Sequence, residues 1–229
     1  MLGARRRGPR SLGMRLVLVL LFTLAAPTRA QITVGGDASV GPSLTTLGAT
    51  GTVEAAGVPV PLDRVDFPTA VGLDARVRLH LHGPTWGARL GAGTLSASDV
   101  FDGASLFDQE GVDVAFALAS AEVTVRQPTR LGDVVVGLGP EVRVILDEGS
   151  AERGLLRHLG DVRQSHLALG GSVALPLDVG GVTVGPELRA GLALTPFSDD
   201  EVEAFGSALR LTGDFRFEHV SVSVTLGVE

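Results

Sequence analysis

The segment GLDARVRLHLHG, residues 72–83, carries a titratable or charged side chain at every second position, namely Asp74, Arg76, Arg78, His80 and His82. Alternate side chains of a β-strand share one face. Because histidine titrates near neutral pH and ligates metals, such a row could respond to protons or hold a metal ion. Alternate residues lie about 7 Å apart along a strand, so two histidines share a metal only with help from a neighbouring strand. We therefore interpret the row as ion pairs, since buried charges are normally paired.

Two further segments place a glutamate and an arginine two residues apart. DVVVGLGPEVRV (133–144) and GVTVGPELRA (181–190) both contain Gly-Pro-Glu-x-Arg. Such pairs could act as gating salt bridges or as static struts, and the narrow interior of a small barrel favours struts. The candidate network of lumen ion pairs comprises Asp74, Arg76, Arg78, His80, Arg89, Glu141, Arg143, His166, Glu187, Arg189 and Arg210.

We find no constellation typical of an enzyme, which would place a nucleophile beside a base. Ser165 and His166 are adjacent, so on a strand they point to opposite faces. Ser221 and Ser223 lie near His219 without an evident acidic partner. The chain has no cysteine and no lysine, which excludes thiolate metal sites and a phosphate-loop lysine. We expect no catalytic activity, no cofactor and no metal.

Seven segments beside 72–83 alternate apolar and polar residues and are predicted to be strands. Within residues 111–126 the apolar phase slips near Ser120, which predicts a β-bulge. The fold class is therefore all-β. The seven segments are 32–41, 86–95, 111–126, 132–146, 166–178, 181–195 and 208–229.

Short and long connections alternate along the chain. The short ones are 82–85, 127–132 and 178–181; the long, acidic ones are 42–67, 96–110, 147–164 (with one possible helical turn at 151–159) and 196–204. This alternation predicts an antiparallel up-and-down β-barrel with tight turns at one end and long loops at the other. If 208–229 is one bulged strand, rather than two strands joined by a turn at 212–214, the barrel has eight strands. A split of 31–56 into a hairpin gives ten.

The face that carries the charges also carries many glycines. Eight strands enclose only enough space for side chains to fill. Long arginine and glutamate side chains inside such a tube need small neighbours, whereas a solvated outer face does not. The pattern favours charges inside and valine and leucine outside. The glycines of this phase are Gly72, Gly91, Gly93, Gly137, Gly139, Gly170, Gly185 and Gly191.

The first 30 residues are typical of a signal peptide. Five arginines precede an apolar run from Leu16 to Ala26, and Thr28 and Ala30 predict cleavage before Gln31. Residues 31–229 are expected to form one barrel domain. All 26 acidic residues but only 13 of the 19 arginines lie there, and so acidic a chain is a poor nucleic-acid binder.

These features together resemble the small outer-membrane β-barrel proteins of bacteria, of the eight-stranded kind. The resemblance implies an integral outer-membrane protein with a structural, adhesive or surface-interaction role carried by its long acidic loops. Its expected partners are outer-membrane lipid and lipopolysaccharide, and carboxylates at 102–110 and 197–203 could take up divalent cations that bridge the latter. The chain departs from the family pattern in ending TLGVE, without an aromatic residue, and in its few aromatic residues.

A soluble alternative stays open at this stage. A periplasmic, lipocalin-like barrel that binds an apolar ligand would turn the same valines and leucines inward. Phe67, Trp86, Phe197 and Phe205 lie at the ends of predicted strands, where interfacial rings of a membrane barrel belong. The two interpretations therefore predict opposite facing of every strand.

Overall fold

A computed structural model describes residues 32–55, 57–66, 69–100, 112–130, 132–147, 165–196, 201–204 and 209–228. The predicted signal peptide, the possible helical turn at 151–159 and much of the predicted loops lie outside these residues. Among the described residues, no helix is long and apolar enough to cross a membrane. The strands are β1 (Thr33–Ala55), β2 (Val58–Asp66), β3 (Ala70–His82), β4 (Trp86–Val100), β5 (Val112–Thr129), β6 (Gly132–Asp147), β7 (Ser165–Ala174), β8 (Leu177–Val179), β9 (Val182–Ala193), β10 (Glu201–Ala204) and β11 (Leu209–Val228).

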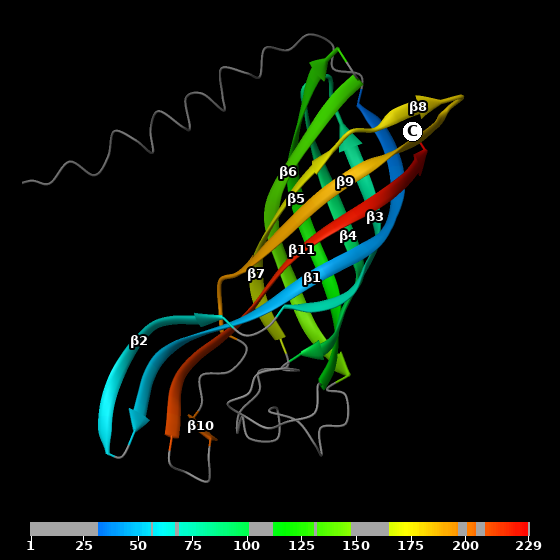
Figure 1. Ribbon diagram of the computed structural model, residues 1–229. Coiled ribbons are helices and arrows are strands. Elements are labelled where there is room, and N and C mark those ends of the chain that lie inside the picture. The colour runs from blue at the N-terminus through cyan, green and yellow to red at the C-terminus, as the bar shows by residue number, and fades with distance from the viewer. Residues whose placement is uncertain are drawn as a thin grey trace, which may run out of the picture. The chain divides into compact units, whose positions relative to one another are not determined.

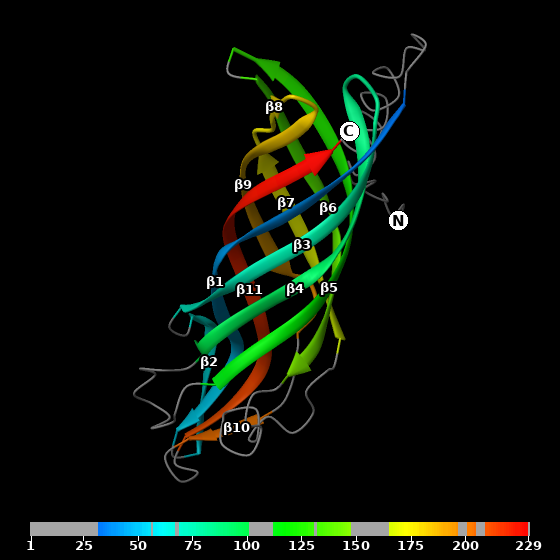
Figure 2. The same ribbon diagram turned by 90° about the vertical axis from the view of Figure 1, so that its right-hand side faces the viewer.

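Eight of these strands close into a ring of antiparallel hydrogen-bonded neighbours. The order is β1-β3-β4-β5-β6-β7-β9-β11, and β11 pairs with both β9 and β1 to close the ring. Figures 1 and 2 show these strands winding around one interior. The predicted eight-stranded, antiparallel up-and-down barrel is confirmed, and the ten-strand alternative is wrong.

The connections also alternate as predicted. Residues 83–85, 130–131 and 180–181 join β3 to β4, β5 to β6 and β8 to β9 at one end, which we call the turn end. In the last of these turns, Gly180 and Gly181 both have positive φ, and Asp178 Oδ1 accepts a hydrogen bond from the Gly181 amide at 3.0 Å. The opposite end, called the loop end, holds the long connections. In Figure 1 the turn end lies at the top, near β8, and the loop end lies below.

Residues 42–67 correct the sequence prediction, which assigned them to a loop. β1 instead runs to Ala55 and forms a hairpin with β2. The first half of β11 pairs with the second half of β1, and β10 pairs with β11, so that four strands continue past the ring at the loop end (Figure 2). Threonine and glycine interrupt the apolar alternation here, so the sequence pattern did not indicate a strand. The strand is stabilised mainly by its backbone pairing with β11.

The register of β11 corrects a second detail. Its pairing with β1 keeps one register from Leu209 to Val228, so the long strand contains no bulge relative to β1. The residues 212–214 lie inside β11 and do not form a turn. One uninterrupted strand is thus the reason for the even strand count.

The bulge predicted near Ser120 is also wrong. The pairing of β5 with β4 keeps one register from Trp86 to Ala97, and the shift between β5 and β6 falls at Ala115 and Phe116. The even-numbered residues of β5 from Val114 to Thr124 face inward. The apolar phase changes near Ser120 because the interior itself changes, from Phe116 and Leu118 on one side to Glu122 on the other.

The facing of the strands separates the two alternatives. The exposed large apolar residues include Val77, Leu79 and Leu81 of β3, whereas Arg78 and His80 between them are buried. Such an arrangement recurs around the ring. The described interior is filled by charged and aromatic side chains while valine and leucine side chains face outward, which is the opposite of the facing that the soluble, lipocalin-like alternative predicts.

Candidate functional site

The inward-facing charges form a connected network. Of the eleven residues predicted for it, ten are buried in the barrel interior: Asp74, Arg76, Arg78, His80, Arg89, Glu141, Arg143, His166, Glu187 and Arg189. The exception is Arg210, whose side chain lies outside what the structure describes. Its backbone pairs with Glu54 and Glu203 in the extension beyond the ring. That position lies nine residues before His219, or about 30 Å along β11, and the prediction for the Arg210 side chain falls outside the described residues.

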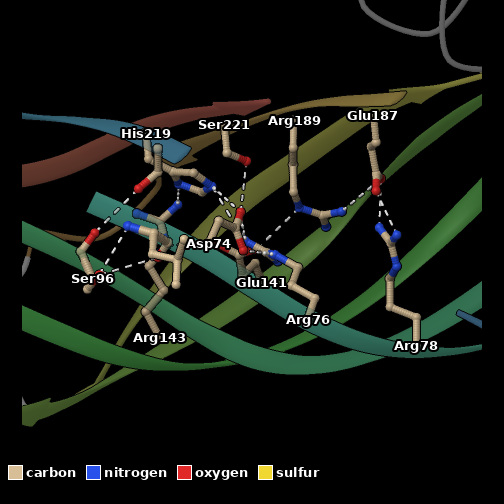
Figure 3. A network of polar contacts seen from close by, with 12 residues as sticks. Asp74, Arg76, Arg78, Ser96, Glu141, Arg143, Glu187, Arg189, His219 and Ser221 are labelled. Carbon is tan, nitrogen blue, oxygen red and sulfur yellow. Dashed lines mark hydrogen bonds and ion pairs between the residues drawn. The ribbon is translucent and has the colours of Figure 1, made fainter. Parts of the chain in front are cut away.

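Glu141 of β6 is the centre of the first group of contacts, the Glu141 cluster (Figure 3). Its carboxylate accepts hydrogen bonds from Arg76 of β3 at 2.5 Å and from Arg143 of its own strand at 2.9 Å. Arg76 also donates to Asp74, at 2.7 and 3.1 Å. Arg143 reaches across the interior to β11, where it contacts His219 Nδ1 at 2.9 Å. The cluster therefore ties β3 and β6 to the strand that closes the ring.

Glu187 of β9 is the centre of a second group, the Glu187 cluster. Arg78 of β3 binds it through both terminal nitrogens at 2.6 Å, the bidentate geometry that arginine and carboxylate favour. The remaining Arg78 nitrogen, Nε, donates to Asp37 of β1 at 2.6 Å. The second oxygen of Asp37 lies 2.9 Å from His80 Nε2. In Figure 3 Arg78 and Glu187 face each other from opposite walls.

Glu122 of β5 joins these clusters. Arg189 of β9 donates to one of its oxygens, and Ser172 of β7 donates to the other at 3.3 Å. Arg189 also lies 3.6 Å from Glu187 and 3.9 Å from Glu141. All eight ring strands thus contribute a residue to these contacts, and β4 contributes Arg89, which lies 3.4 Å from Glu187 and 3.6 Å from Glu122.

Glycines provide the room for these side chains. A Cβ atom at Gly91 would lie 2.9 Å from Arg78 Cγ, and one at Gly93 would lie 2.9 Å from Arg76 Cγ. At Gly191 it would overlap both Arg143 and His219. These three glycines therefore have the spacing role that the sequence indicated.

Three charged or titratable residues of the network were not predicted from the sequence, namely Asp37, Glu122 and His219. Asp37 lies among small residues, where one carboxylate gave no visible row. Glu122 follows the change of interior polarity near Ser120, which was misinterpreted as a change of phase. His219 shares its inward phase with Phe215 and Phe217, so this part of β11 does not alternate in the expected sense. Listing every polar residue of one parity in each strand would have found all three.

An apolar group lies in the interior toward the loop end. Phe116, Phe215 and Phe217 are each fully buried, and the rings of Phe116 and Phe217 meet edge to face with centroids 5.2 Å apart. We call these residues the phenylalanine cluster. His166 lies at its border, with its ring 5.5 Å from that of Phe116. The interior thus has a charged layer and, beside it, an apolar layer.

The charges within the described interior balance. The five buried arginines are matched by the five buried carboxylates of Asp37, Asp74, Glu122, Glu141 and Glu187. Ser221, His219 and Asp74 come together, yet the serine hydroxyl donates to the aspartate at 2.8 Å rather than to the imidazole. That geometry does not activate a serine, because activation requires the base to accept the hydroxyl proton. What the arrangement does is fill and brace the interior.

The fold and the site define a class: a closed eight-stranded antiparallel barrel with paired charges inside and aliphatic side chains outside. No family model matches the chain, and no curated protein matches it. Solved structures that resemble it over most of its length are outer-membrane barrels.

The outer membrane protein OprG from Pseudomonas aeruginosa is 13% identical with a TM-score of 0.46, over 85% of this chain and 96% of that one. Neisserial surface protein A is 11% identical with a TM-score of 0.40, over 82% and 97%. The outer membrane protease OmpT from Escherichia coli is 8% identical with a TM-score of 0.35, over 85% and 96%. At this identity the likeness concerns the fold.

Proposed function

We propose that this chain is an integral outer-membrane β-barrel protein with a structural, adhesive or surface-interaction role and no catalytic activity. The observation that carries the proposal is the apolar belt, the continuous outer surface of exposed valine and leucine side chains around the ring. A soluble protein rarely exposes an apolar surface of this extent. Hydrocarbon is the solvent in which such a surface is stable.

The height of the belt fits a membrane. Outward residues of β3 run from Val71 to Leu81 without a charge. Ten residues span about 34 Å of strand, and at a tilt of about 40° they cover about 25 Å along the axis, the height typical of the apolar band in such barrels.

Polar and aromatic side chains bound the belt at both ends. At the turn end Trp86 is exposed, and Arg126 Nη1 lies 3.7 Å from Asp133. At the loop end Arg64 forms ion pairs with Asp66 at 2.6 Å and Glu218 at 2.8 Å. The hydrogen bonds to Glu218 and Asp66 raise the pKa of Arg64, so it stays charged. An interfacial tryptophan and ionic rims are the boundaries that a membrane-spanning belt requires. The other aromatic residues predicted to lie at the membrane interface are outside the described residues, namely Phe67, Phe197 and Phe205.

The proposed role belongs to the loop end. The strands β1 and β11 continue there past the ring, and β2 and β10 widen them into a four-stranded extension. The strand ends that the long acidic segments of the sequence connect lie at this end of the barrel. We propose that these parts contact the surroundings of the cell, that lipid and lipopolysaccharide surround the belt, and that the ion pairs inside act as struts.

A matched pair of arginine substitutions tests the membrane placement. Leu79→Arg puts a charge in the belt and should cost about 2–4 kcal/mol of folding free energy in a bilayer, as measured by denaturant titration in vesicles. Val58→Arg places the same charge on β2 in the extension, where the native valine is similarly exposed, 61% against 66%, and should change little. Equal and small effects of both substitutions would contradict the proposal.

Fractionation provides an independent test. The protein should remain in envelope membranes after carbonate and salt washes, and should migrate faster on a detergent gel when unheated. Release by carbonate alone would show that the apolar belt does not lie in a bilayer.

A further inference from the structure

The barrel interior contains a partly enclosed cavity at the turn end, which we call the turn-end mouth. Its volume is about 50 Å³, and its lining includes Asp37, Arg78, His80, Trp86, Arg89 and Arg126. A single water needs only about 10–15 Å³ measured in this way, so the mouth holds a larger guest than one water.

Arg89 differs from the other buried arginines in its contacts. Arg76, Arg78, Arg143 and Arg189 each approach a carboxylate to 2.9 Å or less. The shortest carboxylate contacts of Arg89 are Nη1 to Glu187 at 3.4 Å and to Glu122 at 3.6 Å, and its Nε makes no hydrogen bond. Arg89 is nevertheless only 7% exposed. A buried guanidinium with unused donors requires a partner.

The neighbouring carboxylates are already occupied. Both oxygens of Glu187 accept from Arg78, and one also accepts from Thr225 at 3.1 Å. Asp37 is shared by Arg78 and His80. Glu122 is held by Arg189 and Ser172. Among the described residues, no carboxylate therefore lies closer to Arg89 than that of Glu187, whose Oε1 accepts from Arg89 Nη1 at 3.4 Å while it also accepts from Arg78.

The remainder of the lining is suited to an anion. It includes Asp37 and the hydroxyl-bearing side chains of Thr124, Thr183 and Thr225. Of the two buried arginines in the lining, Arg78 is bound by Glu187 and Asp37, so Arg89 is the one without a close carboxylate. The planar fork of a guanidinium binds the oxygens of phosphate through paired hydrogen bonds. Arg126, whose partner Asp133 is 3.7 Å away, adds positive charge at the entrance.

We propose that the turn-end mouth binds a phosphate group, with Arg89 as its principal ligand. Free inorganic phosphate and the headgroup of a phospholipid at the turn-end membrane surface both present this group. The inference rests on the interior contacts alone, so it does not depend on the role proposed for the loop end.

The first experiment uses the full chain folded in a non-ionic detergent. Its thermal unfolding midpoint is measured against increasing inorganic phosphate, with a chloride series of equal ionic strength. We expect a saturable rise with phosphate beyond that with chloride, and an affinity at least tenfold weaker in Arg89→Gln. Arg64→Gln, which removes an exposed arginine far from the mouth, should respond as the native protein does. No saturable rise, or the same rise in Arg89→Gln, overturns the proposal.

A second measurement needs no variant and remains informative if Arg89→Gln does not fold. Phenylglyoxal modifies accessible guanidinium groups, and mass spectrometry locates the modified residues. Phosphate should slow the modification of Arg89 several-fold and leave that of Arg64 unchanged. Equal rates for Arg89 with and without phosphate contradict the site.

A third measurement separates the sources of the phosphate group. Protein extracted from native membranes is examined by native mass spectrometry in detergent. A bound phospholipid that added phosphate displaces supports a headgroup in the mouth. Protein that carries no lipid but shows the saturable phosphate response supports the free anion.

Discussion

At the scale of single residues, the interior is governed by the cost of burying charge. Each ion removed from water loses several kcal/mol, which only well-placed partners offset. The Glu141 cluster meets this condition through two arginines on one carboxylate and a histidine and an aspartate at its border. Removing one charged member of the cluster should therefore lower the free energy of unfolding more than replacing an arginine and its carboxylate partner together.

Glu141→Gln tests this expectation. The substitution leaves Arg143 and Arg76 without their shared charge, so we expect a loss of about 3–5 kcal/mol of unfolding free energy, measured by denaturant titration. The double variant Glu141→Leu/Arg143→Met, which removes charges of both signs, should recover part of this loss.

The control for the cluster is an exposed ion pair. Arg64→Met removes the pairs with Asp66 and Glu218 at the outer rim and should cost less than about 1 kcal/mol. A loss in Arg64→Met as large as in Glu141→Gln would show that burial does not set the energy of these pairs.

The residue scale also shows how far sequence reasoning extends. The row from Asp74 to His80 was predictable because its apolar partners face the opposite environment without exception. Asp37 and Glu122 were missed because they do not belong to an alternating row of charges, and only the parity of their positions along the strand indicates that they face inward. Which residues contact one another in the two clusters depends on the register between strands across the ring. The alternation of residues within one strand gives no information about that register.

At the scale of elements, Gly-Pro pairs shape the strands. They occur at 41–42, 139–140 and 185–186, with the glycine inward and the proline outward. A Cβ at each of these glycines would overlap a carbonyl oxygen of the adjacent strand, that of Val222, Ala121 and Leu175 in turn. The ladders skip two residues at the first two pairs, where proline has no N–H to donate. At these three positions the glycine therefore lets the adjacent strand approach more closely than a side chain would allow.

Gly139→Ala tests this role of glycine. The added methyl group would overlap Ala121 O, so β5 and β6 must separate, and we expect a loss of about 1–3 kcal/mol in denaturant titration. Gly171→Ala on β7 is the matched control, because its Cβ would meet nothing closer than 3.7 Å. Similar stability of the two variants would argue against close approach as the role of Gly139.

The surroundings of each strand explain which strands could be predicted from the sequence. β3 and β6 alternate cleanly because one side meets charges and the other aliphatic surroundings over most of their length. The second half of β1 and β2 continue past the ring, where the two faces no longer differ in this way. Their strands follow from pairing with β11, a contact between distant parts of the chain that local pattern cannot reveal.

At the scale of the whole molecule, two layers close the interior. The charged layer spans the ring through the Glu141 and Glu187 clusters, and the phenylalanine cluster lies toward the loop end. Eight strands leave little space beyond these side chains. The described interior therefore offers no continuous path for ions from one end to the other.

Planar-bilayer recording checks this conclusion. The native protein should produce no conductance steps in concentrated KCl, with a general porin as the positive control. Replacing Phe116 and Phe217 by alanine should not open a path, because the charged layer stays in place. Stepwise conductance of the native protein would show that the ion pairs move apart and act as gates.

The junction of β1 with β11 has a consequence for biogenesis. These two strands share 18 paired positions, and they are the first and last strands described. Neither strand can form the backbone hydrogen bonds of this junction until the other is present. The barrel therefore cannot close while only its earlier strands are available. A precursor held open in this way shows two bare edges and a row of unmatched arginines and carboxylates. It should depend on holdase chaperones and be cut readily by envelope proteases until the final strand arrives.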